Sequence, residues 1–156
     1  MITKKLDDAE SLVNLENFNI KIKIQTSLCF TEDPTRVLVA VQTLFPDIKL
    51  SIEEDLIIGN STDPRHLLHF ANSLRQHQEL DASRRIIRRS WVDNLIRLDF
   101  DKQAALHNRF HFCDPDNAPL GTVILQITCP NPEELIDILA PKWEWIKPTK
   151  PKKRRK

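Results

Sequence analysis

Residues 19–30 read Asn-Ile-Lys-Ile-Lys-Ile-Gln-Thr-Ser-Leu-Cys-Phe, and the first half of this stretch alternates strictly between apolar and polar side chains. Ile20, Ile22 and Ile24 fall on one face, and the lysines between them fall on the other. Because side chains alternate along a β-strand, the pattern predicts a strand with one face on a core and one face toward water. We take this half-buried strand as the element around which the fold is built.

Three helix starts are marked by an acidic residue or an asparagine followed by proline, at Asp33-Pro34, Asp63-Pro64 and Asn131-Pro132. Asp and Asn are preferred N-cap residues, and proline is favoured at the first helical position. A further helix follows the second one almost at once, and a short helical turn comes later in the chain. The predicted helical segments are 34–45, 64–78, 80–91, 102–106 and 132–141.

Alternating and apolar runs predict further strands. Residues 48–52 and 56–59 flank the acidic turn Glu53-Glu54-Asp55 and are predicted to form a hairpin. The other predicted strands are 95–100, 109–113 and 123–127, with a proline-containing loop at 113–121. Runs of neighbouring strands favour hairpins, so the sequence predicts an α+β fold with a largely antiparallel or mixed sheet covered by helices.

The chain of 156 residues is long enough for one domain with a real core. We expect a lightly packed N-terminal arm over residues 1–18, a single α+β domain over 19–146, and a disordered tail over 147–156. No apolar run approaches the roughly 20 residues that cross a bilayer, and the N-terminus lacks a secretory pattern. We therefore expect a cytoplasmic protein without membrane contact, whose three widely spaced cysteines are reduced and structural.

The net charge of +1 hides an asymmetry between the tail and the rest of the chain. The last ten residues hold seven of the 23 Lys and Arg, whereas the remainder has 16 basic against 22 acidic residues. A basic segment releases counterions when it binds phosphates, which gives salt-sensitive and sequence-independent affinity for nucleic acid. The alternative is a solubilising tail that lies on the acidic body. The candidate phosphate-contacting residues in the tail are Lys150, Lys152, Lys153, Arg154, Arg155 and Lys156.

The predicted helix over 80–91 places its arginines on one arc and its apolar residues on the other. Like charges one turn apart destabilise a helix, so the arrangement indicates a polyanionic partner. Arginine binds phosphate with two hydrogen bonds and stacks on bases, which suits RNA. The alternative is a solvated face paired with the acidic body, and Arg84 at i+3 from Asp81 fits an intrahelical ion pair. The arginines left as phosphate candidates are Arg85, Arg88 and Arg89.

Several short motifs resemble those of a small, functionally uncharacterised archaeal family labelled predicted exosome subunit or RNA-binding protein. They lie between about Ile20 and Leu139: Thr31-Glu32-Asp33, Gly59, Leu80-Asp81-Ala82-Ser83-Arg84, Lys102-Gln103-Ala104-Ala105 and Leu120-Gly121-Thr122-Val123. The resemblance implies a fold like that of a 5S-rRNA-binding ribosomal protein, a two-layer structure with a curved sheet and helices on one face. It implies RNA binding and no catalytic residues, and it leaves Arg85, Arg88, Arg89 and the tail as particulars of this sequence.

The remaining residues with chemical potential give weaker indications. Lys102 lies between two strands and is a candidate phosphate contact, or alternatively part of a tight crossover. His66 with His69 and His107 with His111 do not have the spacing of a known metal motif, so no metal or other cofactor is expected. Only two glycines occur, which excludes a glycine-rich phosphate loop.

The sequence thus predicts a non-enzymatic RNA-binding accessory protein that contacts the phosphate backbone through a basic helix and a basic C-terminal tail. The alternative is a protein–protein interaction module without direct nucleic-acid binding, either a homodimer or a subunit of a larger RNA-processing complex.

Overall fold

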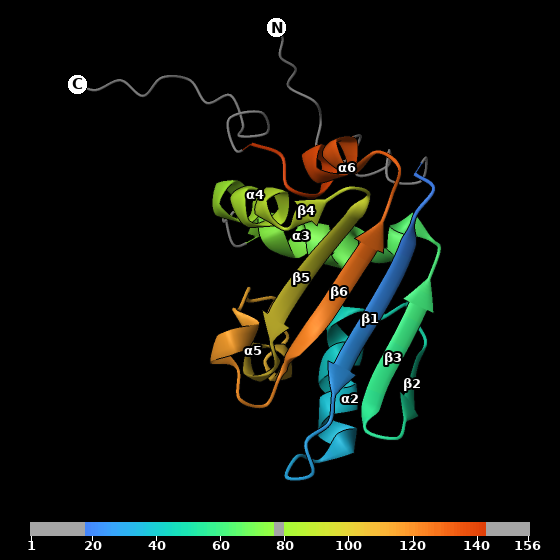
Figure 1. Cartoon of the computed structure of the whole chain (residues 1–156), viewed down its shortest axis with the longest axis vertical. Helices are drawn as coiled ribbons and strands as arrows, with labels where there is room; N and C mark the ends of the chain where they lie inside the picture. Colours follow the sequence, from blue (N-terminus) through green and yellow to red (C-terminus); the bar gives the residue numbers. More distant parts are fainter. Residues whose placement is uncertain (1–17, 77–79, 143–156) are drawn as a thin grey trace, which may run out of the picture.

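The computed structural model describes residues 18–76 and 80–142, and these form an α+β fold with a six-stranded antiparallel sheet (Figure 1). The strands lie in the order β2-β3-β1-β6-β5-β4, and the sheet is open rather than closed into a barrel. Their bounds are β1 Lys21–Ser27, β2 Leu50–Glu53, β3 Leu56–Ser61, β4 Trp91–Val92, β5 Leu95–Asp101 and β6 Thr122–Thr128. The α+β class and the antiparallel sheet predicted from the sequence are confirmed.

One face of the sheet forms the hydrophobic core. Ile22 and Ile24 of β1 are buried, whereas Lys21 and Lys23 between them are exposed, as the alternation predicted. The same period runs through β5 and β6, whose Leu98 and Leu125 are buried. The helices lie behind the sheet in Figure 1 or at its two ends, so the face turned toward the viewer carries no described helix.

The helices of the described chain are α2 Pro34–Leu44, α3 Leu68–Gln76, α4 Leu80–Arg89, α5 Lys102–Leu106 and α6 Pro132–Leu139. Asp33 caps α2 by accepting a hydrogen bond from the Thr35 amide at 3.0 Å, with Pro34 in the first turn. Asp63 caps η2 Pro64–Leu67 in the same way. This element is one turn of 3-10 helix, and it leads directly into α3. These two predicted helix starts are therefore confirmed, because cap chemistry is local. α6 also begins at Pro132 as predicted, although the Asn131 side chain makes no cap hydrogen bond.

The predicted helix over 80–91 is too long at its C-terminal end. α4 stops at Arg89, and Trp91 pairs with Ile96 in the short strand β4. The two residues Asp93 and Asn94 connect β4 to β5, and Asp93 adopts a φ of +56°. A two-residue hairpin loop that contains a positive φ fits antiparallel pairing, and this pairing overrides the helical pattern.

The predicted strand over 109–113 is also wrong. Only an isolated bridge between Phe112 and Phe100 forms there. Phe110 instead packs on Phe70 and Phe100, with ring centroids 4.9 and 5.2 Å apart. The apolar residues of this segment therefore anchor a loop on the core, where they need no continuous strand.

No helix in the described ranges is long and apolar enough to span a membrane. The predicted N-terminal arm, apart from Phe18, and the whole basic tail lie outside the described residues, as does the end of the predicted helix over 64–78.

Candidate nucleic-acid interface

The arginine surface of α4 consists of Arg85, Arg88 and Arg89, which are all exposed. The helix is held in place by its opposite side, where Leu80, Ser83 and Ile87 are buried. α4 contacts α3, α6 and β5 and lies at the end of the sheet where β1 and β5 begin (Figure 1). This geometry fits the prediction that the three guanidiniums lie on one exposed face of the helix.

Arg88 has two neighbours on the surface. Its Nη1 lies 3.9 Å from Oε2 of Glu133 on α6, and its Cζ lies 5.8 Å from the centroid of the Trp91 ring. Both Arg88 and Glu133 are substantially exposed, so this ion pair contributes little to stability. The guanidinium is oriented by these contacts and still faces solvent.

Arg84 has a different role, because it is largely buried between α4 and α6. Its Nη1 donates to the Ala140 carbonyl at 3.2 Å, and its Nη2 lies 2.7 Å from Oδ1 of Asp137. The second contact is an ion pair whose geometry falls short of a hydrogen bond. Arg75 of α3 donates to the carbonyls of Ile138 and Leu139 at 2.7 and 3.0 Å. Two arginines thus satisfy the last carbonyls of α6, where cations are favoured by the helix dipole.

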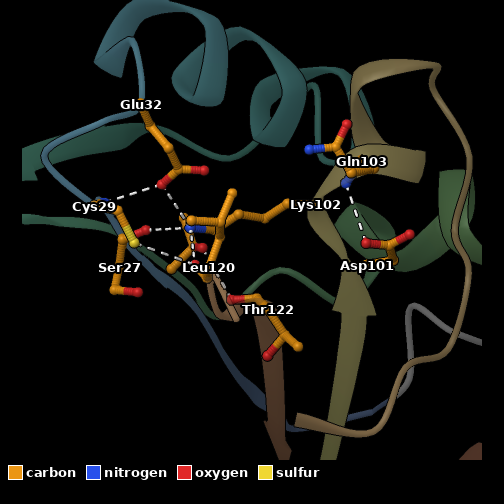
Figure 2. Close-up of polar contacts among 9 residues, drawn as sticks. Ser27, Cys29, Glu32, Asp101, Lys102, Gln103, Leu120 and Thr122 are labelled. Carbon is orange, nitrogen blue, oxygen red and sulfur yellow. Dashed lines mark hydrogen bonds and ion pairs between the residues drawn. The ribbon is translucent and has the colours of Figure 1, made fainter. Parts of the chain in front are cut away.

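Lys102, a candidate phosphate contact from the sequence, is buried at the opposite end of the sheet. Figure 2 shows its ammonium between Ser27, Leu120 and Glu32. It donates to the Ser27 and Leu120 carbonyls at 2.6 Å each and to Oε1 of Glu32 at 3.0 Å. An ammonium has three N–H donors, and all three have partners within the protein. Lys102 therefore lacks the exposed position from which a lysine contacts phosphate.

Glu32 and Gly121 complete this buried lysine site. Oε1 of Glu32 also accepts the Cys29 amide at 2.9 Å (Figure 2). Gly121 has a φ of +87°, and a Cβ there would lie 2.9 Å from the Ser27 hydroxyl. The site joins three motifs that are distant in sequence, those at Glu32, Lys102 and Gly121. Their proximity is what the sequence could not show.

A groove of about 430 Å³ opens beside Lys102, between α5 and the loop that precedes β6. Asp101 and Asp114 line it, and each carboxylate caps a short helical turn, α5 and the 3-10 turn η3 Pro115–Asn117. Carboxylates repel phosphates, so this groove is a poor candidate for backbone contact.

Two of the histidines make structural contacts, and two of the cysteines have unreactive thiols. Nδ1 of His66 lies 2.6 Å from the Ser61 hydroxyl, and His69 packs on Phe110. Within residues 18–76 and 80–142 no three His, Cys, Asp or Glu side chains gather as metal ligands do. Burial raises the pKa of the Cys113 and Cys129 thiols, so both stay protonated at neutral pH and lack the reactivity of a thiolate.

Sequence reasoning did not single out the basic residues on the uncovered face of the sheet. Lys21 and Lys23 lie there on β1, and Arg97 lies there on β5. The available signal was the alternation itself, since it places a basic residue at each polar position at the start of β1. The tail candidates, from Lys150 to Lys156, lie outside the described residues.

The geometry defines a small α+β protein with an exposed arginine surface at one end of an antiparallel sheet. A family model described as RNA binding matches residues 21–129. This range includes the strands β1 to β6 and also Glu32, Lys102 and Gly121 of the buried lysine site. The chain belongs to this family.

The chain is also similar to archaeal proteins named UPF0201. The UPF0201 protein of Methanothermobacter thermautotrophicus is 31% identical over 121 residues, which cover 78% of this chain and 91% of that relative. The UPF0201 protein of Sulfurisphaera tokodaii is 32% identical, with coverage of 78% and 88%. The predicted relationship to an uncharacterised archaeal family is confirmed.

Solved structures of this family share the fold. An uncharacterised UPF0201 protein superposes with a TM-score of 0.69 at 26% identity, over 78% of this chain and 94% of that one. The UPF0201 protein of Methanococcus jannaschii gives a TM-score of 0.67 at 25% identity, over 78% and 93%. The resemblance found in the sequence also implied an exosome subunit and a fold like that of a ribosomal protein, and these two points stay predictions.

Proposed function

We propose that the protein is a non-enzymatic, cytoplasmic RNA-binding accessory protein that contacts the phosphate backbone through Arg85, Arg88, Arg89 and its basic C-terminal tail. The observation that carries the proposal is the arginine surface of α4, three exposed guanidiniums on a helix that is anchored by its other side. The family's description as RNA binding supports the class of partner.

The arginines of α4 differ in their contacts, and the proposal assigns them different roles on that basis. Arg84 is engaged with Asp137 and the end of α6, so its charge is used within the protein. Arg85 and Arg89 have no ion-pair partner among the described residues and project their charge into solvent. Arginine offers five N–H donors in a planar fork that fits phosphate oxygens, so an exposed set of this kind suits a polyanion.

Lys102 is left out of the proposed contacts. Its three donors are occupied, and its side chain is only 6% exposed. To bind phosphate it would have to break a buried ion pair, which costs several kcal/mol. The proposed contacts from the sequence are therefore reduced to the arginine surface of α4 and the tail residues Lys150, Lys152, Lys153, Arg154, Arg155 and Lys156.

The test is a titration of labelled RNA, structured and single-stranded, with the full chain over a series of salt concentrations. The key variant is Arg85→Gln/Arg89→Gln, which removes two charges without breaking a described ion pair. The matched control is Arg36→Gln/Arg109→Gln, which removes two exposed charges on α2 and after α5, distant from α4 (Figure 1).

We expect the key variant to weaken binding and to reduce the slope of log K against log salt by about 1.4 on single-stranded RNA and about 1.8 on duplex RNA, the values for two lost phosphate contacts. The control variant should bind as the wild type does. A wild-type Kd weaker than about 10⁻⁴ M at low salt would contradict the proposal, since non-specific binding already reaches that strength. A chain ending at residue 146 that loses all binding while the key variant loses none would exclude the helix as a contact.

A further inference from the structure

The uncovered face of the sheet is a second surface of interest, because the described helices lie behind the sheet or at its ends (Figure 1). Register places four polar side chains of this face in one row across four neighbouring strands. The row runs Asn60 of β3, Lys23 of β1, Gln126 of β6 and Arg97 of β5. Strands lie about 4.8 Å apart, so the row is about 14 Å long.

The next row toward the arginine surface is mixed, with one lysine, one threonine and two exposed apolar side chains. It contains Lys21 of β1, Thr128 of β6, Leu95 of β5 and Val92 of β4. Val92 follows Arg89 of α4 by three residues. The two rows and the arginine surface therefore meet at the same end of the sheet, where β1 and β5 begin (Figure 1).

The charges on these two rows are all positive. They come from Lys21, Lys23 and Arg97, whose guanidinium is half exposed. On the outward face of β5 the acid Asp99 lies one row farther away and is bound by Arg97 at 3.2 Å and by the Thr122 hydroxyl at 2.7 Å. Arg97 uses two of its five donors on Asp99 and keeps three for another acceptor.

The composition of this face also indicates which form of RNA fits it. None of the residues that face outward on β3, β1, β6 and β5 is aromatic, so these strands offer no platform on which unstacked bases can stack. Amide and cationic side chains donate well to phosphate and 2′-hydroxyl oxygens. In A-form RNA the shallow minor groove displays those groups on a wide surface that proteins recognise by shape.

We propose that Lys21, Lys23, Asn60, Gln126 and Arg97 contact an A-form RNA duplex across its minor groove and extend the arginine surface of α4 onto the sheet. This inference rests on the proposed RNA-binding function and adds to it the form of the RNA and a second contacting surface. In this proposal the duplex binds the uncovered face of the sheet, and the helices pack on the opposite face.

The experiment measures fluorescence anisotropy with three labelled probes of one sequence: a blunt RNA duplex, its single strand, and the corresponding DNA duplex. The variant Lys21→Gln/Lys23→Gln removes two exposed charges from the sheet face. It is compared with wild type, with Arg85→Gln/Arg89→Gln on α4, and with the matched control Arg36→Gln/Arg109→Gln. Circular dichroism and thermal unfolding of each variant verify that the fold is retained.

The expected result is tightest binding to the RNA duplex. The sheet-face variant should bind it about tenfold or more weakly at 0.1 M salt, with a salt slope lower by about 1.8, as for two lost phosphate contacts. Unchanged duplex binding by that variant, while the α4 variant weakens, would overturn this inference and leave the proposed function standing. Equal or tighter binding of the single strand or of the DNA duplex would overturn the assignment to A-form RNA. Absence of RNA binding by the wild type would remove both proposals.

Discussion

Lys102 and Glu32 form a buried ion pair, with Nζ and Oε1 3.0 Å apart although 70 residues separate them in the sequence. Their side chains are 6% and 11% exposed. The pair joins the segment after β1 to the start of α5, and the Lys102 bond to Leu120 adds the loop that precedes β6 (Figure 2). One side chain therefore connects three chain segments at this end of the sheet.

Lys102→Met should lower the free energy of unfolding by about 3–5 kcal/mol, because it leaves the Glu32 carboxylate buried without its cation. The measurement is equilibrium urea unfolding at neutral pH. Lys21→Met, at an exposed lysine of β1, is the matched control and should change stability by less than about 0.5 kcal/mol. A loss below about 1 kcal/mol for Lys102→Met would contradict the view that this lysine is structural.

Arg84→Gln should destabilise the fold, whereas Arg85→Gln should leave its stability unchanged. The first substitution removes the ion pair with Asp137 and the hydrogen bond to the Ala140 carbonyl, with an expected cost of about 1.5–3 kcal/mol for a hydrogen bond made by a charged group. The second touches an exposed side chain. Thermal unfolding of the two variants distinguishes the neighbouring arginines, and equal effects would contradict the division of roles along α4.

Gly121→Ala should cost about 1–3 kcal/mol, because an alanine is strained at a φ of +87° and its Cβ would lie 2.9 Å from the Ser27 hydroxyl. Combining it with Ser27→Ala separates the two causes, since that change removes the close oxygen but not the backbone strain. We expect partial recovery in chemical denaturation experiments. Full recovery would show that backbone strain contributes nothing.

Asp63 should make stability depend on pH between about 4 and 2. The Arg65 side chain, by its hydrogen bonds to this carboxylate, lowers the pKa of Asp63 from 3.8 to about 2. A folded-state pKa below the unfolded one gives stability that is present above pH 4 and is lost as pH falls toward 2. The difference in unfolding midpoint between wild type and Asp63→Asn should shrink over that window, since asparagine still caps η2. A difference that is constant with pH would contradict this assignment.

Glu133→Gln should raise RNA affinity about 1.5- to 5-fold, if Arg88 contacts phosphate, because the carboxylate 3.9 Å away competes for the same guanidinium. Glu134→Gln is the matched control, an exposed neighbour that makes the same change in charge. The gain should disappear in an Arg88→Gln background. Equal gains from Glu133→Gln and Glu134→Gln would mean that only the overall charge matters.

The elements that could be predicted from the sequence are those specified by local chemistry. The alternation around Ile22 and Ile24 predicted β1, and the Asp-Pro pairs predicted where α2 and η2 begin. Burial with a period of two and N-capping involve only a few neighbouring residues, so a single sequence contains the needed information.

The elements that were mispredicted depend on distant partners. Trp91 continues the apolar side of α4 in the sequence, yet it pairs with Ile96 because the Asp93 turn folds the chain into a hairpin. Phe110 and Phe112 alternate as in a strand, yet their rings pack on Phe70 and Phe100 of the core. In both places tertiary packing overrides the local pattern.

The sequence by itself determined the α+β class, the half-buried strand β1 and the place of the arginines on one arc of α4. Only the tertiary structure decided which basic residues face solvent. It buries Lys102 among Ser27, Glu32 and Leu120, and it aligns Lys23 with Arg97 on the uncovered face of the sheet. The reason is that burial and alignment of a charge depend on residues far away in the chain, whereas its place on a helix or strand depends on its neighbours.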